Sequence, residues 1–188
     1  MPKAYLAGPD VFLPHVASIA AAKIALCARY GITGISPFNS DFAAGLPAQK
    51  LWRQIYEDDV RLMRESDLII ANLTPFRGAS ADAGTLVELG WFLGQGRPVF
   101  AYSNAVEDFA ARTRAQIGVL PDPLPGIVVE DFGLADNLMI AGAVEYGGGG
   151  RLYRPEDGQA RAFDSLDVFE RCVAAAAALF KTTTKACC

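Results

Sequence analysis

Residues that bind metals are scarce in this sequence. Its 188 residues include one histidine and four cysteines, and no two cysteines form a C-x-x-C pair. A structural zinc site needs four such ligands at short spacings, so a metal is not expected. The G-x-G-x-x-G, G-x-x-x-x-G-K-[ST] and G-x-S-x-G motifs are missing as well. Dinucleotide, ATP and serine-hydrolase sites therefore lack their usual signatures, and we expect no cofactor.

Positive charge is also in short supply. The 17 Lys and Arg residues are outnumbered by 21 Asp and Glu, and the net charge is −4. Without a basic cluster to neutralise phosphates, nucleic acid is not an expected partner. The Ala-rich runs at 16–28 and 173–180 are too short to span a bilayer, and the N-terminus does not resemble a signal peptide. We expect a cytoplasmic protein without a membrane partner.

Hydrophobic residues make up 52% of the chain and charged residues 20%. These values predict one globular domain over residues 1–188, with a flexible tail from about residue 182. Short apolar runs alternate with helical patterns, which predicts a doubly wound α/β fold with a flavodoxin-like or Rossmann-like parallel sheet. The expected strands are 4–7, 32–36, 67–73, 98–102 and 126–130, and the expected helices are 14–30, 48–65, 82–96, 105–117, 137–146 and 166–180.

In such folds a ligand binds beyond the carboxyl ends of the strands. The segment from Tyr5 to Phe12 and the loop at 74–82 follow two of the expected strands, so both are predicted to lie there. The glycine run at 147–150 is expected to be a flexible linker.

Glu88 is a single carboxylate within an otherwise uncharged helical run. A charge buried there without a partner or a purpose costs several kcal/mol. Helical spacing places Gly84 on the same face, which leaves room for a ligand, together with Trp91 and Phe92, which are expected to form a wall for a flat ring. Asp82 precedes the helix and is predicted to cap it. The alternative for Glu88 is an exposed carboxylate on an amphipathic helix.

A second acid, Asp59, falls on the apolar stripe of the preceding helix, between Ile55 and Leu62. Its neighbour Asp58 points to the solvated side. Asp59 is either catalytic or a structural acid bonded to nearby backbone. Paired carboxylates without a metal suit glycosidic-bond chemistry, in which one acts at the sugar carbon and the other handles the leaving group's proton.

Four segments together resemble the nucleoside 2-deoxyribosyltransferases, over residues 4 to about 150. They are YLAGPDVF at 5–12, DD at 58–59 followed by SDLIIAN at 66–72, DAGTLVELG at 82–90, and DNLM at 136–139. The resemblance implies exchange of the 2-deoxyribosyl group between purine or pyrimidine bases, with slow hydrolysis as a side reaction. The implied substrates are 2-deoxynucleosides and free bases.

The resemblance also implies roles for single residues. Glu88 matches the nucleophile, which forms a covalent deoxyribosyl intermediate and gives net retention. Asp59 matches the acid that exchanges a proton with the base, and Tyr5 matches the tyrosine that positions the nucleophile.

Further matches concern substrate binding. Asp82 matches a residue that binds sugar hydroxyls near the 5′ end. Gly8, Asp10 and Phe12 lie where the family contacts its substrate, the last two at the base. Asn137 matches a position that reaches into the neighbouring subunit's site, which implies a homo-oligomer.

Two alternatives remain open. A deoxynucleoside 5′-monophosphate N-glycosidase on the same fold resembles this chain but has a phosphate-binding serine six positions before its glutamate. Here that position is Asp82, and two like charges at ~4 Å cost about 4 kcal/mol at an effective dielectric near 20. A non-catalytic nucleoside-binding protein would keep the pocket without needing Glu88.

Overall fold

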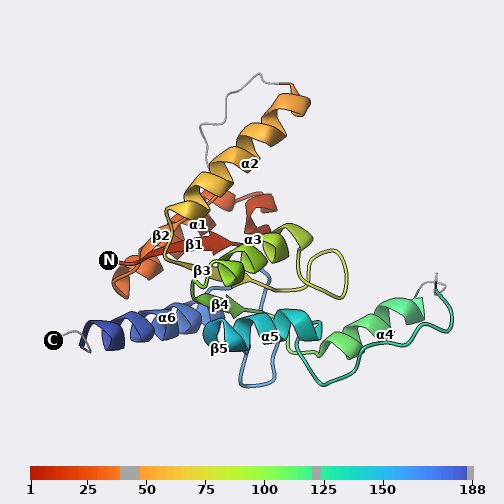
Figure 1. The fold of residues 1–188 in the computed structure, drawn as a ribbon. Coiled ribbons are helices and arrows are strands. Elements are labelled where there is room, and N and C mark those ends of the chain that lie inside the picture. Colours follow the sequence, from red (N-terminus) through yellow and green to blue (C-terminus); the bar gives the residue numbers. More distant parts are fainter. Residues whose placement is uncertain (39–46, 120–123, 186–188) are drawn as a thin grey trace.

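The computed structural model describes residues 1–38, 47–119 and 124–185. Five parallel strands form one sheet in the order β2-β1-β3-β4-β5, and helices flank it (Figure 1). This is the flavodoxin-like strand order, so the predicted fold class is confirmed. The strands are β1 (Lys3–Ala7), β2 (Thr33–Ile35), β3 (Leu68–Asn72), β4 (Val99–Tyr102) and β5 (Gly148–Tyr153). The helices are η1 (Pro9–Phe12), α1 (Val16–Arg29), α2 (Ala48–Arg64), α3 (Ala83–Gly94), α4 (Phe109–Val119), α5 (Leu138–Tyr146) and α6 (Asp167–Lys185).

The central strands are apolar throughout because both faces of the sheet are covered. Alternate side chains point to opposite faces, so Leu6 and Ile70 pack on one side with α1 and α6. Tyr5 and Ile69 pack on the other side with α3, α5 and the end of α2. The site residues of β1 and α3 therefore share one face of the sheet.

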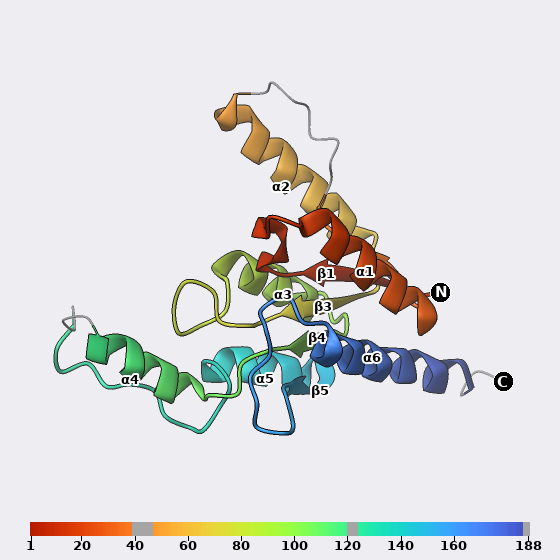
Figure 2. The same ribbon diagram turned by 180° about the vertical axis from the view of Figure 1, so that it is seen from behind.

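Two helices extend away from this body. In Figures 1 and 2, α2 projects upwards beyond the β2 edge of the sheet, and α4 projects sideways beyond α5. Among the described side chains of α2, only Met63 is buried. Within the described residues, no helix is long and apolar enough to cross a membrane.

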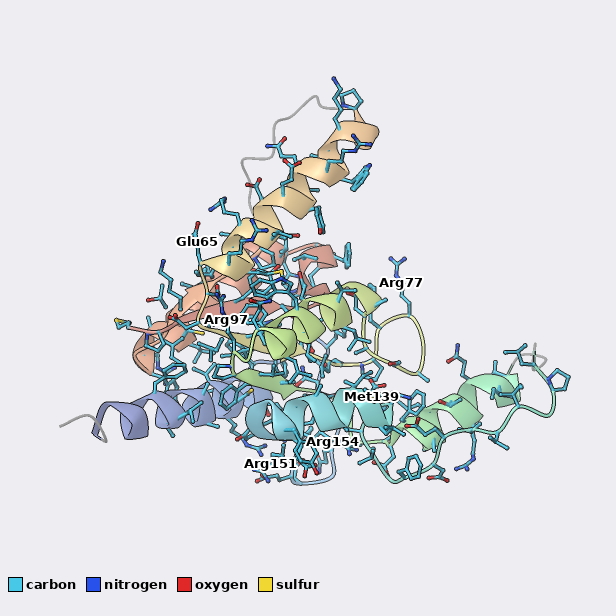
Figure 3. All side chains as sticks on the ribbon, viewed as in Figure 1. Glu65, Arg77, Arg97, Met139, Arg151 and Arg154 are labelled. Atoms are coloured by element: carbon cyan, nitrogen blue, oxygen red, sulfur yellow. The ribbon has the colours of Figure 1, made fainter. Side chains whose placement is uncertain are left out.

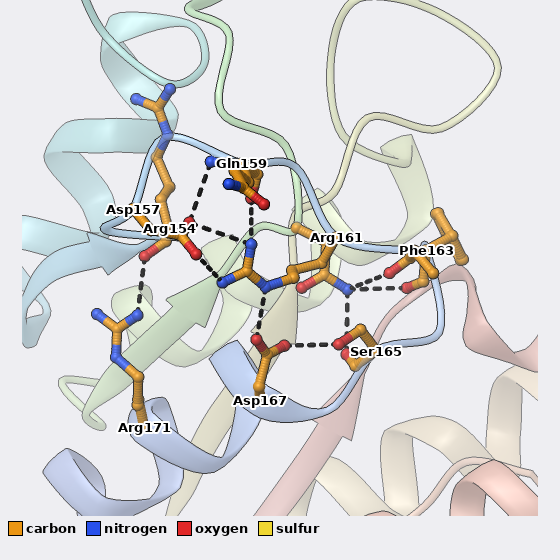
Figure 4. Close-up of polar contacts among 10 residues, drawn as sticks. Arg154, Asp157, Gln159, Arg161, Phe163, Ser165, Asp167 and Arg171 are labelled. Carbon is orange, nitrogen blue, oxygen red and sulfur yellow. Dashed lines mark hydrogen bonds and ion pairs between the residues drawn. The ribbon is translucent and has the colours of Figure 1, made fainter.

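The segment between β5 and α6 is fixed by charged groups (Figure 4). Arg161 donates to Asp157 Oδ2 and to Asp167 Oδ2, each at 2.7 Å. Phe163 in this segment packs against Phe76, with ring centroids 6.4 Å apart. The segment thus supports the loop that follows β3.

One predicted strand is wrong. Residues 126–130 form no strand, and Ile127 and Val128 are 68% and 91% exposed. The fifth strand is β5, which begins inside the glycine run expected to be a linker. At the other end of the chain, α6 reaches Lys185 and so extends into the expected tail; residues 186–188 lie outside the described residues.

Candidate active site

A pocket of about 400 Å³ opens beside the carboxyl end of β1. This is the point in the sheet where successive connections pass to opposite faces, which is where open α/β sheets bind ligands. Its size suits a small organic molecule. It is lined by Gly8, Val11, Phe12, Pro37, Phe38, Ile55, Asp59, Asp82, Gly84, Thr85 and Glu88.

Glu88 lies on the pocket wall and is held by Tyr5. The Tyr5 hydroxyl donates to Glu88 Oε1 at 2.7 Å, from a side chain that is fully buried in β1. The pKa of Glu88 is raised from 4.5 to about 7: burial raises it most, the hydrogen bond from Tyr5 lowers it, and the negative charges of Asp59 and Asp82 raise it. Burial and the neighbouring Glu88 charge raise the pKa of Tyr5, so its hydroxyl remains a donor.

Asp59 reaches the same pocket from α2. Its Oδ1 atom is buried and has no hydrogen-bond partner among the described residues. Burial, followed by the charge of Asp58, raises the pKa of Asp59 to about 6. An unpartnered buried carboxyl oxygen favours the protonated state. Asp58 itself pairs with Arg61 at 3.4 Å on the solvated side, as its position predicts.

The two carboxyl groups are coupled, since the charge on Asp59 raises the pKa of Glu88. Such a pair loses its protons in two steps that belong to both groups together. Between pH about 6 and 7 the pair therefore holds about one proton, which lies mostly on Glu88, and the form with Glu88 ionised and Asp59 protonated is the minority form. A site with one ionised and one protonated carboxyl can attack with the first and donate a proton from the second.

Asp82 caps α3, as the sequence predicts. Its Oδ2 accepts the Thr85 backbone N–H at 2.9 Å and the Thr85 hydroxyl at 3.0 Å. Within the described chain Oδ1 has no such partner, and Asp82 also lines the pocket. Gly84 lines it too, so the space that its missing side chain leaves is on the ligand side.

Gly8 requires glycine for two reasons. Its φ of 151° is rarely adopted by other residues, and a Cβ there would lie 2.7 Å from the Cβ of Asn72. The backbone that links β1 to η1 therefore passes directly over β3.

The structure places Asp10 away from the pocket wall, contrary to its expected contact with the base. Asp10 is buried and pairs with Lys23 Nζ at 2.6 Å, and Asn72 Nδ2 donates to both of its oxygens at 3.2 Å. Burial lowers the pKa of Lys23, and the charge of Asp10 opposes that shift. The ion pair anchors η1 to α1.

The aromatic side chains of the pocket differ from those expected. Phe92 is buried against Tyr5 with ring centroids 6.0 Å apart, and neither Phe92 nor Trp91 lines the pocket. Phe12, which the resemblance placed near the base, lines the pocket, and so does Phe38. Phe12 is 65% exposed and stacks on Phe76 at 5.5 Å, so its ring is available at the pocket mouth. The contributions of Phe38 and Ile55 were missed because their segments carry no motif.

Asn137 lies outside this pocket. Its side-chain oxygen accepts the Met139 backbone N–H at 3.0 Å, and its Nδ2 donates to Glu130 Oε2 at 2.7 Å. It is therefore the N-cap of α5. Asp136 accepts from Ser80 Oγ at 2.6 Å and from the Ala81 backbone N–H at 2.9 Å. In this way it ties α5 to the loop that precedes α3.

The titratable residues that line the pocket are Asp59, Asp82 and Glu88, and all three are acidic. Among the described residues, no group of three or more His, Cys, Asp and Glu could hold a metal ion. The fold and this site define a class: an α/β protein whose carboxylate pocket lies at the switch point of a flavodoxin-like sheet.

The sequence model of the nucleoside 2-deoxyribosyltransferase family matches residues 4–139, which is most of the chain. The protein therefore belongs to the nucleoside 2-deoxyribosyltransferase family.

Individual proteins are also similar to this chain. A 2-deoxyribosyltransferase from Leishmania mexicana is 27% identical, with a TM-score of 0.60 over 92% of this chain and 97% of that one. A conserved protein from Enterococcus faecalis V583 is 21% identical, with a TM-score of 0.55 over 92% and 97% of the two chains, and shows the fold alone. An uncharacterized protein of Schizosaccharomyces pombe is 29% identical over 79% of this chain and 80% of its own length.

Proposed function

We propose that the protein transfers the 2-deoxyribosyl group between nucleobases, using Glu88 as the nucleophile and Asp59 as the acid and base. The observation that carries this proposal is the pairing of two unlike carboxyls in one pocket. Glu88 accepts a hydrogen bond from Tyr5, whereas the buried oxygen of Asp59 has no partner in the described chain. Family membership supports the same assignment.

In the first half-reaction, the ionised carboxylate of Glu88 attacks C1′ of a 2-deoxynucleoside. The C1′–N bond breaks, and its electron pair leaves with the base. Protonated Asp59 donates its proton to a ring nitrogen of that base, which departs neutral. The products are a free base and a deoxyribosyl ester of Glu88.

In the second half-reaction, a nitrogen of the incoming base attacks C1′ and displaces Glu88. Asp59, now ionised, takes the proton that the incoming base loses. Two inversions at C1′ give net retention. Water can replace the incoming base, and slow hydrolysis follows as a side reaction. The charge that develops on the sugar also favours a substrate without the electron-withdrawing 2′-hydroxyl.

The remaining pocket residues suit a nucleoside. Asp82 has one oxygen free of partners in the described chain, which can accept a hydrogen bond from a sugar hydroxyl. The rings of Phe12 and Phe38 offer flat apolar surface for a base. The titratable groups on this wall are all acidic and would repel a 5′-phosphate, so the nucleotide hydrolase is the weaker candidate.

Base exchange between deoxynucleoside donors and free bases, followed by chromatography, tests this proposal. We expect exchange with thymidine or a purine deoxynucleoside, little with ribonucleosides, and much less with thymidine monophosphate. Glu88→Gln should abolish exchange while still binding the nucleoside. Full exchange by Glu88→Gln would refute the mechanism, and a wild-type protein that binds but never exchanges would support the non-catalytic alternative.

A further inference from the structure

Helix α2 carries Asp59 but is attached to the molecule mainly at its carboxyl end. Its amino-terminal half projects away from the body (Figures 1 and 2). Among the described side chains of the helix only Met63 is buried, one turn beyond Asp59. Where Asp59 lies relative to Glu88 therefore depends on how the carboxyl end of α2 is held.

The guanidinium of Arg97 holds that end. Its Nη1 donates to three backbone carbonyls, at 2.9 Å from Met63 O, 3.1 Å from Arg64 O and 2.6 Å from Ser66 O. The last carbonyls of a helix have no partner within the helix, and the negative end of the helix dipole favours a cation. One side chain thus satisfies several carbonyl groups just beyond Asp59.

Arg97 is also fixed to the helix that carries Glu88. Its backbone N–H donates to Phe92 O at 3.0 Å, and its guanidinium lies 5.2 Å from the centre of the Trp91 ring. Both residues lie one turn beyond Glu88 on α3, and Phe92 stacks on Tyr5. In Figure 3, Arg97 lies between the end of α2 and helix α3. It therefore connects the two helices that supply the carboxyl pair.

We propose that Arg97 is a positioning residue that sets the placement of Asp59 relative to Glu88. This role rests on the proposed function, in which Asp59 delivers a proton to the departing base. Arg97 does not line the pocket and so acts through Asp59. Its loss should slow only the step that needs a proton from Asp59, whereas a purely structural role would lower every reaction alike.

Two donors that differ in this requirement provide the test. Guanine leaves 2′-deoxyguanosine only with help from a proton, while 7-methyl-2′-deoxyguanosine already carries a positive charge and releases a neutral base unaided. In single-turnover reactions without acceptor, Arg97→Ala should release guanine about 10- to 100-fold more slowly than wild type. Release of 7-methylguanine should change by less than about 3-fold. The amount of base released from the faster donor also measures the concentration of intact sites, which corrects for unfolded protein.

Arg97→Lys keeps the positive charge but lacks the planar guanidinium that lies on Trp91, so its defect should be intermediate. Arg151→Ala is the matched control, because Arg151 lies over Tyr153 and pairs with Glu156 on the exposed far edge of the sheet. It should leave both rates unchanged. If the protein does not accept the methylated donor, 2′-deoxyuridine and 5-fluoro-2′-deoxyuridine replace the two guanine donors. The comparison is the same, because fluorine makes uracil a better leaving group.

An equal fall with both donors would overturn the positioning role, as would unchanged rates with both. A wild-type protein that releases no base from any donor would remove the proposed function itself, and the role of Arg97 with it. The two failures are therefore distinguishable.

Discussion

At the scale of single residues, Glu88 experiences opposing influences. Burial and neighbouring negative charges raise its pKa, whereas the 2.7 Å hydrogen bond from Tyr5 lowers it. The bond stabilises the ionised form that attacks, and it also orients Oε1. The reactive form needs Asp59 protonated, which is lost above pH about 6, and Glu88 ionised, which is lost below pH about 7. The share of this minority form is largest between the two values, so transfer should depend on pH as a bell with its maximum in that interval.

Tyr5→Phe isolates the contribution of this hydrogen bond. The phenylalanine ring keeps the stack on Phe92, so the thermal midpoint should change little. A hydrogen bond to a charged group is worth about 1.5–3 kcal/mol, so we expect kcat to fall by roughly 10- to 100-fold. Steady-state exchange and thermal unfolding measure the two quantities. An unchanged kcat would show that Tyr5 does not position Glu88.

Glu88→Gln should stabilise the protein at high pH. Because the folded state raises the pKa of Glu88 from 4.5 to about 7, folding favours the protonated form. Stability is thus complete below the ordinary pKa and falls as pH rises through the raised one. Glutamine does not titrate, so the variant should gain roughly 1–3 kcal/mol at pH 8 and about nothing at pH 4. Urea unfolding at both values measures this, and an equal difference at the two would contradict it.

At the scale of elements, the first turn of α3 combines a structural and a binding feature. Asp82 caps the helix through Oδ2 and also lines the pocket. Asparagine caps a helix about as well as aspartate but carries no charge, whereas alanine neither caps the helix nor carries a charge. Comparing the two substitutions therefore separates the roles.

Asp82→Asn should keep the thermal midpoint close to wild type, whereas Asp82→Ala should lose about 1 kcal/mol of stability. If the charge of Asp82 excludes phosphate, Asp82→Asn should also raise the kcat/KM ratio of thymidine monophosphate to thymidine by about 10-fold or more, because a repulsion of a few kcal/mol is removed. Chromatography with both donors measures the ratio. No change in it would show that something other than this charge selects the substrate.

Element boundaries were predictable where the pattern is local. The apolar run of β3 and the capped start of α3 are visible in the sequence, because burial on two faces and an N-cap have local signatures. β5 was not predictable from its glycine run: Gly147, the residue just before the strand, packs so closely on β4 that a Cβ there would lie 2.8 Å from Val99 Cβ. That close approach to β4 requires glycine, and its cause lies 48 residues away in the chain (147 − 99).

The site was predictable to a similar extent. Glu88, Asp59 and Asp82 line one pocket, and Tyr5 is bonded to Glu88. Helical periodicity and the cap position pointed to the first three, whereas only the resemblance pointed to Tyr5. The sequence pattern could not show that Asp10 is a structural acid and not a pocket acid, because its partner Lys23 lies in another element.

At the scale of the whole molecule, apolar side chains remain exposed on neighbouring helices. Val87 on α3 and Met139 at the start of α5 are each 72% exposed, and the two helices pack together. Met139 is labelled in Figure 3. Exposed apolar side chains on adjacent helices suit contact with another chain. They suit the homo-oligomer that the resemblance implies, in which Asn137 would complete the neighbouring site.

Mixing inactive variants tests that arrangement. If each site uses Glu88 from one subunit and Asn137 from another, Glu88→Gln and Asn137→Ala should be nearly inactive alone. After mixing and subunit exchange, about a quarter of the sites in a reciprocal dimer would hold both residues and recover activity. Sedimentation would report the assembly. No recovery despite subunit exchange would place Asn137 outside the neighbour's site.

The central claim is that Glu88 becomes covalently attached to deoxyribose, and intact-protein mass spectrometry tests it most directly. The protein is incubated with a 2-deoxynucleoside and no acceptor base, quenched in acid, weighed, and then digested to locate the modification. We predict a mass increase of one deoxyribosyl group on the peptide that contains Glu88, lost on adding a free base and absent from Glu88→Gln. Base exchange without any adduct, or an adduct that persists in Glu88→Gln, would contradict the account.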